Sequence, residues 1–168
     1  GAAHIFTQSE RGDWVEMAKL LASNGATHDS FGDAVAISGN SVVVGAPWAD
    51  MSGRSGGAAY IFARAADGNW RETAQLVPAD NSVEDYFGKS VAISGNTAIV
   101  GAPDSDPNGI GSGSAYIFTR NAQGAWVETA KLAPPSLDQG DAFGFAVAIH
   151  GDSALVSAIR ADARGRSS

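Results

Sequence analysis

Short segments of strand-like pattern run through the chain, and none carries the 3.6-residue period of an amphipathic helix. The segment WRETAQL at 70–76 alternates with a period of two, which predicts a strand with one exposed face. TAIVGA at 97–102 is apolar almost throughout, which predicts a strand covered on both faces. Only Gly95-Asn96 separates it from the apolar run at 87–94, and this dipeptide is typical of a hairpin turn. The pattern predicts an all-β protein of short antiparallel strands.

The same pattern recurs every 56 residues. A tryptophan that opens one strand and a phenylalanine that opens another return at this spacing, at Trp14, Trp70 and Trp126 and at Phe31, Phe87 and Phe143. The 168 residues divide into three repeats, 1–56, 57–112 and 113–168. A period of this length is typical of solenoids, propellers and other repeat arrays. Each repeat contains four predicted strands, which is the number in a propeller blade.

In the first two repeats a Phe-Gly dipeptide is followed by a Gly-Ala-Pro tripeptide. Phe31-Gly32 is followed by Gly45-Ala46-Pro47, and Phe87-Gly88 is followed by Gly101-Ala102-Pro103. These landmarks resemble the FG-GAP repeat, in the bacterial form related to the blades of integrin α-subunits. The resemblance implies a β-propeller of four-stranded antiparallel blades in an extracellular or cell-surface protein. The third repeat has Ser157-Ala158-Ile159 in place of Gly-Ala-Pro, so we expect a different turn there.

The repeats are out of phase with the blades that the resemblance implies. In such propellers the innermost strand of a blade comes first, and here it is the strand that opens with Phe-Gly. We therefore expect complete blades at 31–76 and 87–132, and a split blade from 143–159 together with 1–20. Three blades cannot close a ring, and an open arc would expose apolar faces and strand edges. The sequence thus predicts head-to-tail self-association, with six blades in a homodimer favoured. The alternative is that these residues are an excerpt from a longer propeller.

Composition narrows the classes of function. The net charge of −7 argues against nucleic acid as a partner. No apolar run approaches the roughly 20 residues of a membrane helix, so no membrane insertion is expected. The absence of cysteine excludes disulfides, thiolate metal sites and cysteine nucleophiles. No nucleophile elbow, phosphate loop or zinc-binding helix motif occurs, so the chain is not expected to be an enzyme.

One loop is a candidate calcium site. Asp104, Asp106 and Asn108 alternate ahead of Gly109, and oxygen ligands in this spacing open a calcium-binding loop. The twelfth position of the pattern, where a bidentate glutamate is expected, holds Ala115 instead. A polar loop without a metal is the alternative interpretation.

Four further residues are candidates for ligand binding. Trp48 occurs once, at a loop position where the other repeats have aspartate and arginine, which suggests an aromatic platform for a protein or a sugar. Asp29, Asp85 and Asp141 each stand two residues before a repeated phenylalanine. They are either a ring of carboxylates that binds a cation or basic ligand, or structural caps of loop amides. Their repetition favours the structural role.

The loops vary while the strands repeat, which is how a scaffold that presents a binding surface behaves. The long loops should lie on one acidic face of the propeller. We therefore expect a non-enzymatic recognition or adhesion module that binds a protein ligand on this face. Two alternatives remain open: a carbohydrate-binding, lectin-like propeller, and a purely structural or engineered self-assembling fragment without a ligand.

Overall fold

The computed structural model describes residues 1–50 and 56–162. Within these ranges every regular element is a strand, which confirms the predicted all-β class. Residues 51–55 and 163–168, from the first and third predicted repeats, lie outside the described part. The strands are β1 (Ala3–Gln8), β2 (Trp14–Leu20), β3 (Val35–Ser38), β4 (Ser41–Ala46), β5 (Ala58–Arg64), β6 (Trp70–Leu76), β7 (Ser90–Ser94), β8 (Thr97–Ala102), β9 (Ser114–Arg120), β10 (Trp126–Leu132), β11 (Phe143–His150) and β12 (Ser153–Ala158).

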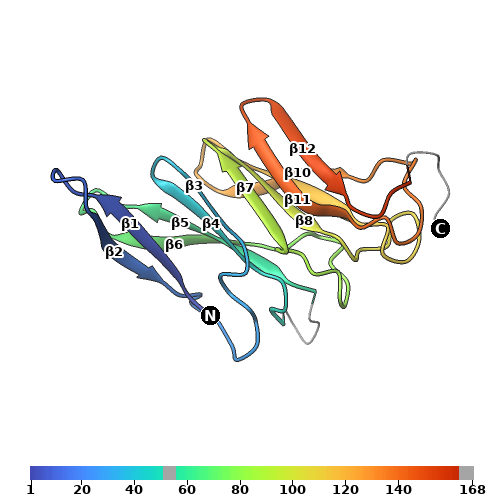
Figure 1. The fold of residues 1–168 in the computed structure, drawn as a ribbon, viewed down its shortest axis with the longest axis horizontal. Coiled ribbons are helices and arrows are strands. Elements are labelled where there is room, and N and C mark those ends of the chain that lie inside the picture. Colours follow the sequence, from blue (N-terminus) through green and yellow to red (C-terminus); the bar gives the residue numbers. More distant parts are fainter. Residues whose placement is uncertain (51–55, 163–168) are drawn as a thin grey trace.

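The strands form two four-stranded and two two-stranded antiparallel sheets (Figure 1). The first blade has the order β3-β4-β5-β6 and lies within 31–76, and the second has the order β7-β8-β9-β10 and lies within 87–132. β1 and β2 form an N-terminal half-blade, and β11 and β12 form a C-terminal half-blade. The two half-blades lie at opposite ends of the row of sheets. Each therefore has a neighbouring sheet on one side only.

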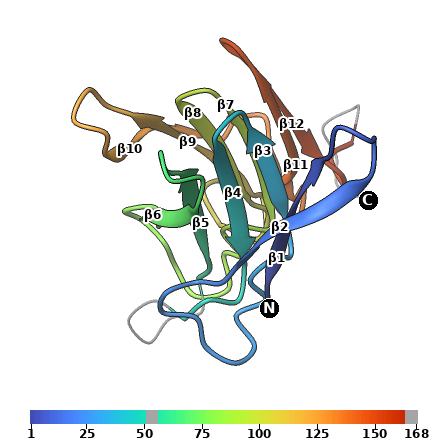
Figure 2. The same cartoon turned by 90° about the vertical axis from the view of Figure 1, so that its left-hand side faces the viewer.

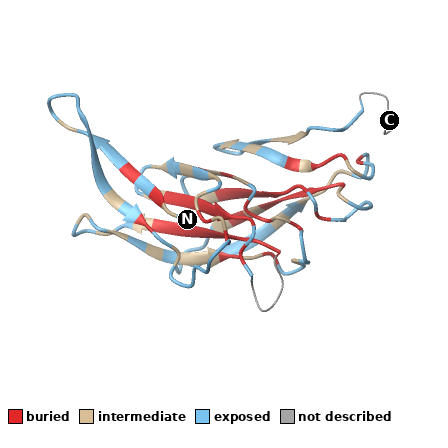
Figure 3. Ribbon diagram, turned by 60° about the horizontal axis from the view of Figure 1, so that its bottom comes forward, coloured by how far each residue is buried: buried red, intermediate tan, exposed pale blue. Residues whose placement is uncertain are grey.

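Apolar side chains fill the space on both sides of the first blade. The cluster between the first and second blades includes Val43, Ile61, Val100 and Phe118. The cluster between the N-terminal half-blade and the first blade includes Ile5, Leu20, Val44 and Phe62. In the end-on view of Figure 2 the inner strands β3 and β7 lie on one side, and the outer strands β6 and β10 on the other. Figure 3 shows that burial is concentrated in the two complete blades. Burial of apolar area drives this stacking, so each sheet is stabilised by the sheets that cover its faces.

Glycine allows neighbouring sheets to approach backbone to backbone. A Cβ atom added to Gly45 would stand 1.9 Å from the carbonyl oxygen of Gly88, and one added to Gly101 would stand 1.9 Å from that of Gly144. No side chain fits at either position, because the backbone of the next sheet occupies the space. The third repeat has Ser157 at the equivalent position in β12.

The turn after β12 differs from our expectation. The amide of Ala161 donates a hydrogen bond of 3.4 Å to the carbonyl of Ala158, closing the same four-residue turn that follows β4 and β8. The prediction of a different turn was therefore wrong. A turn closed by this backbone bond accepts most residues at its central positions, so the loss of proline does not change it.

Candidate functional site

The long loops gather at one end of the sheets, and the short hairpin turns lie at the other (Figure 1). This arrangement follows from the antiparallel registers, which bring the start of β3 and the end of β4 together with the start of β5 and the end of β6. The second blade has the same registers. We call this end the loop face, and its described residues are 21–34, 47–50, 56–57, 77–89, 103–113, 133–142 and 159–162.

Each loop that leads into an inner strand contains a buried aspartate. Asp29, Asp85 and Asp141 are 5–7% exposed, and each carboxylate accepts a hydrogen bond of 2.7 Å from the backbone N–H three residues earlier. The residue after each of them has a positive φ angle, 56° at Ser30, 53° at Tyr86 and 55° at Ala142. Because the arrangement recurs in all three loops, its geometry is that of a structural cap that holds a strained backbone. Ligand binding by these carboxylates stays a prediction.

Trp48 lies beside an aromatic residue of the next blade. Its ring meets that of Tyr86 edge to face, with the centroids 4.6 Å apart and the planes at 66°. Trp48 nevertheless remains 48% exposed. The two rings border a hollow of about 280 Å³, which we call the aromatic hollow. Its aromatic and charged lining residues are Trp48, Tyr86, Lys89, Asp104, Phe145 and Arg160. They come from the first blade, the second blade and the C-terminal half-blade, so three consecutive sheets build it.

Carboxylates extend from this hollow across the loop face. A wider hollow of about 770 Å³ shares Tyr86, Asp104 and Arg160 with the aromatic hollow and adds Glu84 and Asp106. Burial raises the pKa of Asp104; Arg160 acts to lower it, and the charges of Asp106 and Glu84 raise it further. Burial, with the charges of Glu84 and Asp104, likewise raises the pKa of Tyr86. The negative charges are therefore close enough to repel one another, and a cation placed among them would be attracted.

The predicted calcium ligands have separate contacts. Asp106 Oδ1 accepts a hydrogen bond of 2.7 Å from the amide of Gly111, which closes the loop on itself. Asn108 Nδ2 donates one of 3.0 Å to the carbonyl of Pro134. Asp104 lines the aromatic hollow. In residues 1–50 and 56–162, no three or more histidine, aspartate or glutamate side chains are grouped as for a metal ion. Calcium binding through Asp104, Asp106 and Asn108 stays a prediction.

The glutamates of the outer strands connect neighbouring sheets. The carboxylate of Glu72 accepts hydrogen bonds of 2.8 Å from both the amide and the hydroxyl of Ser23, in the loop that follows the preceding half-blade. Glu128 accepts one of 3.3 Å from the amide of Ala79. These contacts give the repeated glutamates a structural role between blades.

The sequence singled out Trp48 but missed the other aromatic residues of the hollow. Tyr86 occupies a loop position at which the other repeats have serine and alanine. Phe145 occupies a strand position at which they have aspartate and lysine, and it is 42% exposed. The signal that marked Trp48, an aromatic residue at an unrepeated position, would also have found these two. Their proximity could not be read from the sequence, because they lie 38 or more residues away from Trp48.

The comparison with known families agrees with this geometry. The FG-GAP repeat model matches residues 14–62, 70–118 and 126–168, which is more than half of the chain. The chain therefore belongs to the FG-GAP repeat family, and its four-stranded sheets are blades of a β-propeller. No curated relative matches the chain. Among the described residues, no helix has the length and apolar character needed to cross a membrane.

Proposed function

We propose that this chain is a non-enzymatic recognition or adhesion module that binds a protein ligand on its loop face, in an extracellular or cell-surface setting. The observation that supports it is the aromatic hollow. Trp48 and Tyr86 pack against one another and leave an exposed ring surface beside the aromatic hollow. Tryptophan and tyrosine in such positions carry much of the binding energy in protein interfaces, because they bury a large rigid surface at a small entropic cost.

The surrounding charge selects a ligand with basic groups. Glu84, Asp104 and Asp106 line the wider hollow, which shares Tyr86 with the aromatic hollow, and Arg160 also lines it. A lysine or arginine side chain can lay its aliphatic stem along an aromatic ring and place its charge among carboxylates. The net charge of −7 adds long-range attraction for such a ligand. We therefore infer that a basic segment of a partner protein binds here.

Peptide binding tests this proposal. Wild-type protein is titrated against lysine- and arginine-rich peptides, and against acidic peptides of the same length. We expect binding of the basic peptides alone, and a loss of about thirtyfold or more in Trp48→Ala, the size typical of a hot-spot residue. Trp14→Ala is the matched control, because Trp14 is 69% exposed but stands on the N-terminal half-blade. Equal binding of basic peptide by wild type and Trp48→Ala would contradict the proposal.

A glycan array separates the carbohydrate alternative. Exposed tryptophan also stacks on sugars, so Trp48 by itself suits both ligands. Glycan binding that disappears in Trp48→Ala, without peptide binding, would identify a lectin-like module. Self-association without any ligand would identify a purely structural one.

We also propose that the chain completes its propeller by self-association, with a homodimer favoured. The support is the exposure of apolar residues on the half-blades, where Leu155 of β12 is 74% exposed and Phe6 of β1 is 52% exposed. Each half-blade has two strands where a complete blade has four. Light scattering should give twice the 17.1 kDa mass of one chain. A monomer at micromolar concentration would contradict this.

A further inference from the structure

We propose that β12 of one chain adds to the free edge of β1 in a second copy, in the register set by the internal repeat, and that Ser157 limits how closely the two copies pack. The inference rests on the self-association proposed above, and it specifies which surfaces meet. The proposed occupant of each half-blade edge is a second copy of this chain.

The complete blades define the register. β4 pairs with β5 and β8 pairs with β9 at positions related by the 56-residue step: Ser41 with Ala63 and Val43 with Ile61 in the first blade, Thr97 with Thr119 and Ile99 with Ile117 in the second. Shifting the β8–β9 pairs by another 56 residues gives the expected pairs between β12 of one copy and β1 of the next. They are Ser153 with Thr7, Leu155 with Ile5 and Ala158 with Ala2. Both edges are free in the described residues, because β12 pairs only with β11 and β1 only with β2.

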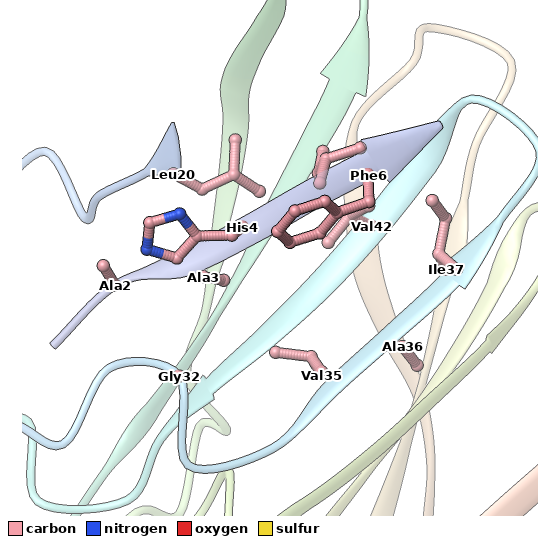
Figure 4. Close-up of a pocket in the computed structure, with 11 residues that line it drawn as sticks. Ala2, Ala3, His4, Phe6, Leu20, Gly32, Val35, Ala36, Ile37 and Val42 are labelled. Atoms are coloured by element: carbon pink, nitrogen blue, oxygen red, sulfur yellow. The ribbon is translucent and has the colours of Figure 1, made fainter. Parts of the chain in front are cut away.

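A mainly apolar hollow lies beside β1, at the position where Leu155 of a second copy would pack. It has a volume of about 390 Å³ and is lined largely by apolar residues of β1, β3 and β4 (Figure 4). Val35 and Ile37 of β3 are each 59% exposed at this hollow, whereas their counterparts Val91 and Ile93 in the second blade are 8% and 7% exposed.

Val91 and Ile93 are covered by the cluster that contains Val43 of the preceding blade. Leu155 stands at the position of Val43 in the third repeat. Leu155 of one copy would therefore cover Val35 and Ile37 of the other.

An aromatic pair points to the same junction. Phe31 packs edge to face on Phe62 at 6.0 Å between centroids, and Phe87 packs on Phe118 at 5.9 Å. In the third repeat the first member of the pair is Phe143, and the 56-residue step makes Phe6 of a second copy its partner. Phe6 is 52% exposed, so it is free to pack there.

Ser157 makes the junction between copies looser than the junctions within a chain. Gly45 and Gly101 touch the backbone of Gly88 and Gly144 so closely that no Cβ fits. The same step places Ser157 of one copy against Gly32 of the other, where its Cβ would meet the carbonyl oxygen. The two backbones must therefore separate at this point, which weakens the contact. Closure between copies would be reversible while the blades within each chain stay packed.

Disulfide cross-linking tests the register. Because the chain has no native cysteine, only the introduced thiols can form a disulfide. The variant Ser153→Cys/Thr7→Cys places both thiols on facing positions of the proposed pair. The control Ser153→Cys/Gln8→Cys moves one thiol to the next residue, whose side chain points to the opposite face of the sheet. All three positions are exposed strand residues. We expect mild oxidation to convert most of the first variant, and little of the control, to covalent dimer. Equal cross-linking of both, or none in the first, would overturn the register.

These experiments distinguish the proposed self-association from the proposed register of β12 on β1. A dimer by light scattering without the expected cross-link would leave self-association standing and reject this register. A monomer would reject both. Loss of peptide binding bears on neither.

Replacing Ser157 tests its role. Ser157→Gly should lower the dimer dissociation constant by about tenfold, because it removes the clash that the internal junctions avoid. Gly101→Ser is the matched control, which should lower the melting temperature by placing serine at an internal junction. Unchanged or weaker dimerisation of Ser157→Gly by analytical ultracentrifugation would overturn this part of the proposal.

Discussion

The complete blades and the half-blades have nearly the same sequence pattern but very different surfaces. Ile99 in the second blade is fully buried, whereas Leu155 at the same repeat position is 74% exposed. Phe62 is 3% exposed and its counterpart Phe6 is 52% exposed. The difference does not arise from the residues themselves, since both members of each pair are large and apolar. It arises from the number of sheets that cover them, as expected of a repeat array in which each unit contacts only its neighbours.

The largest effect should come from removing the repeated phenylalanine at the entrance to each inner strand, which is Phe87 just before β7 and Phe143 as the first residue of β11. Phe87 is fully buried and packs on Tyr116 and Phe118, so Phe87→Ala should lower the free energy of unfolding by about 3–5 kcal/mol. Phe143 is only partly buried, so Phe143→Ala should cost clearly less at concentrations where the chain is monomeric. Urea denaturation measures both. Equal losses would show that the half-blade is packed as firmly as a blade.

A smaller effect should follow from removing the glutamates of the outer strands. Glu72→Ala loses two hydrogen bonds of 2.8 Å to Ser23 and should cost about 1 kcal/mol. Glu16→Ala should cost less, because the hydrogen bond of 2.7 Å between Glu16 and Nδ1 of His4 joins two exposed side chains. Dimerisation should not increase the cost of Glu16→Ala. In a dimer the residue equivalent to Ser23 would be Pro135 of the other copy, and proline has no N–H to donate to Glu16. Melting curves of the two variants compare them, and a larger loss in Glu16→Ala would contradict this account.

The smallest effect concerns a difference between the two complete blades. In the first blade the hydroxyl of Tyr60 donates to the neutral Asn24, at 3.0 Å. In the second, Tyr116 donates to Asp80, which also pairs with Lys131. Burial opposes the ionisation of Asp80, but the hydrogen bonds from Lys131 and Tyr116 outweigh burial and lower its pKa.

Because the folded-state pKa of Asp80 is lowered, its contribution to stability is complete above the ordinary aspartate pKa of about 3.9 and is lost as the pH falls through the folded value. Asp80→Asn makes the second blade resemble the first. The variant should be less stable than wild type at pH 7, by less than about 1 kcal/mol because the pair is partly exposed. The difference should be smaller near pH 3, below the ordinary aspartate pKa, because protonation of Asp80 removes its charge. Urea midpoints at both pH values measure it, and a difference independent of pH would show that the charge does not matter.

Much of the fold could be predicted because its signals are local. The alternation in WRETAQL, the Gly95-Asn96 turn and the 56-residue period need no knowledge of distant contacts, and the strands and four-stranded sheets follow them. The candidate site was predicted less completely. Trp48 was found from its unrepeated position, but its pairing with Tyr86 depends on how two blades pack.

The sequence by itself determined the strands and the repeat, because hydrophobic period and turn residues act over a few neighbouring positions and recur along the chain. The order of the strands within a blade was expected from the resemblance to FG-GAP propellers. The tertiary structure decided which copy of each repeated residue is core and which is surface. It also decided that aromatic residues from three consecutive sheets line one hollow, and that glycine is required at Gly45 and Gly101. These outcomes depend on contacts between sheets that are tens of residues apart in the chain, and packing in space, rather than local pattern, sets them.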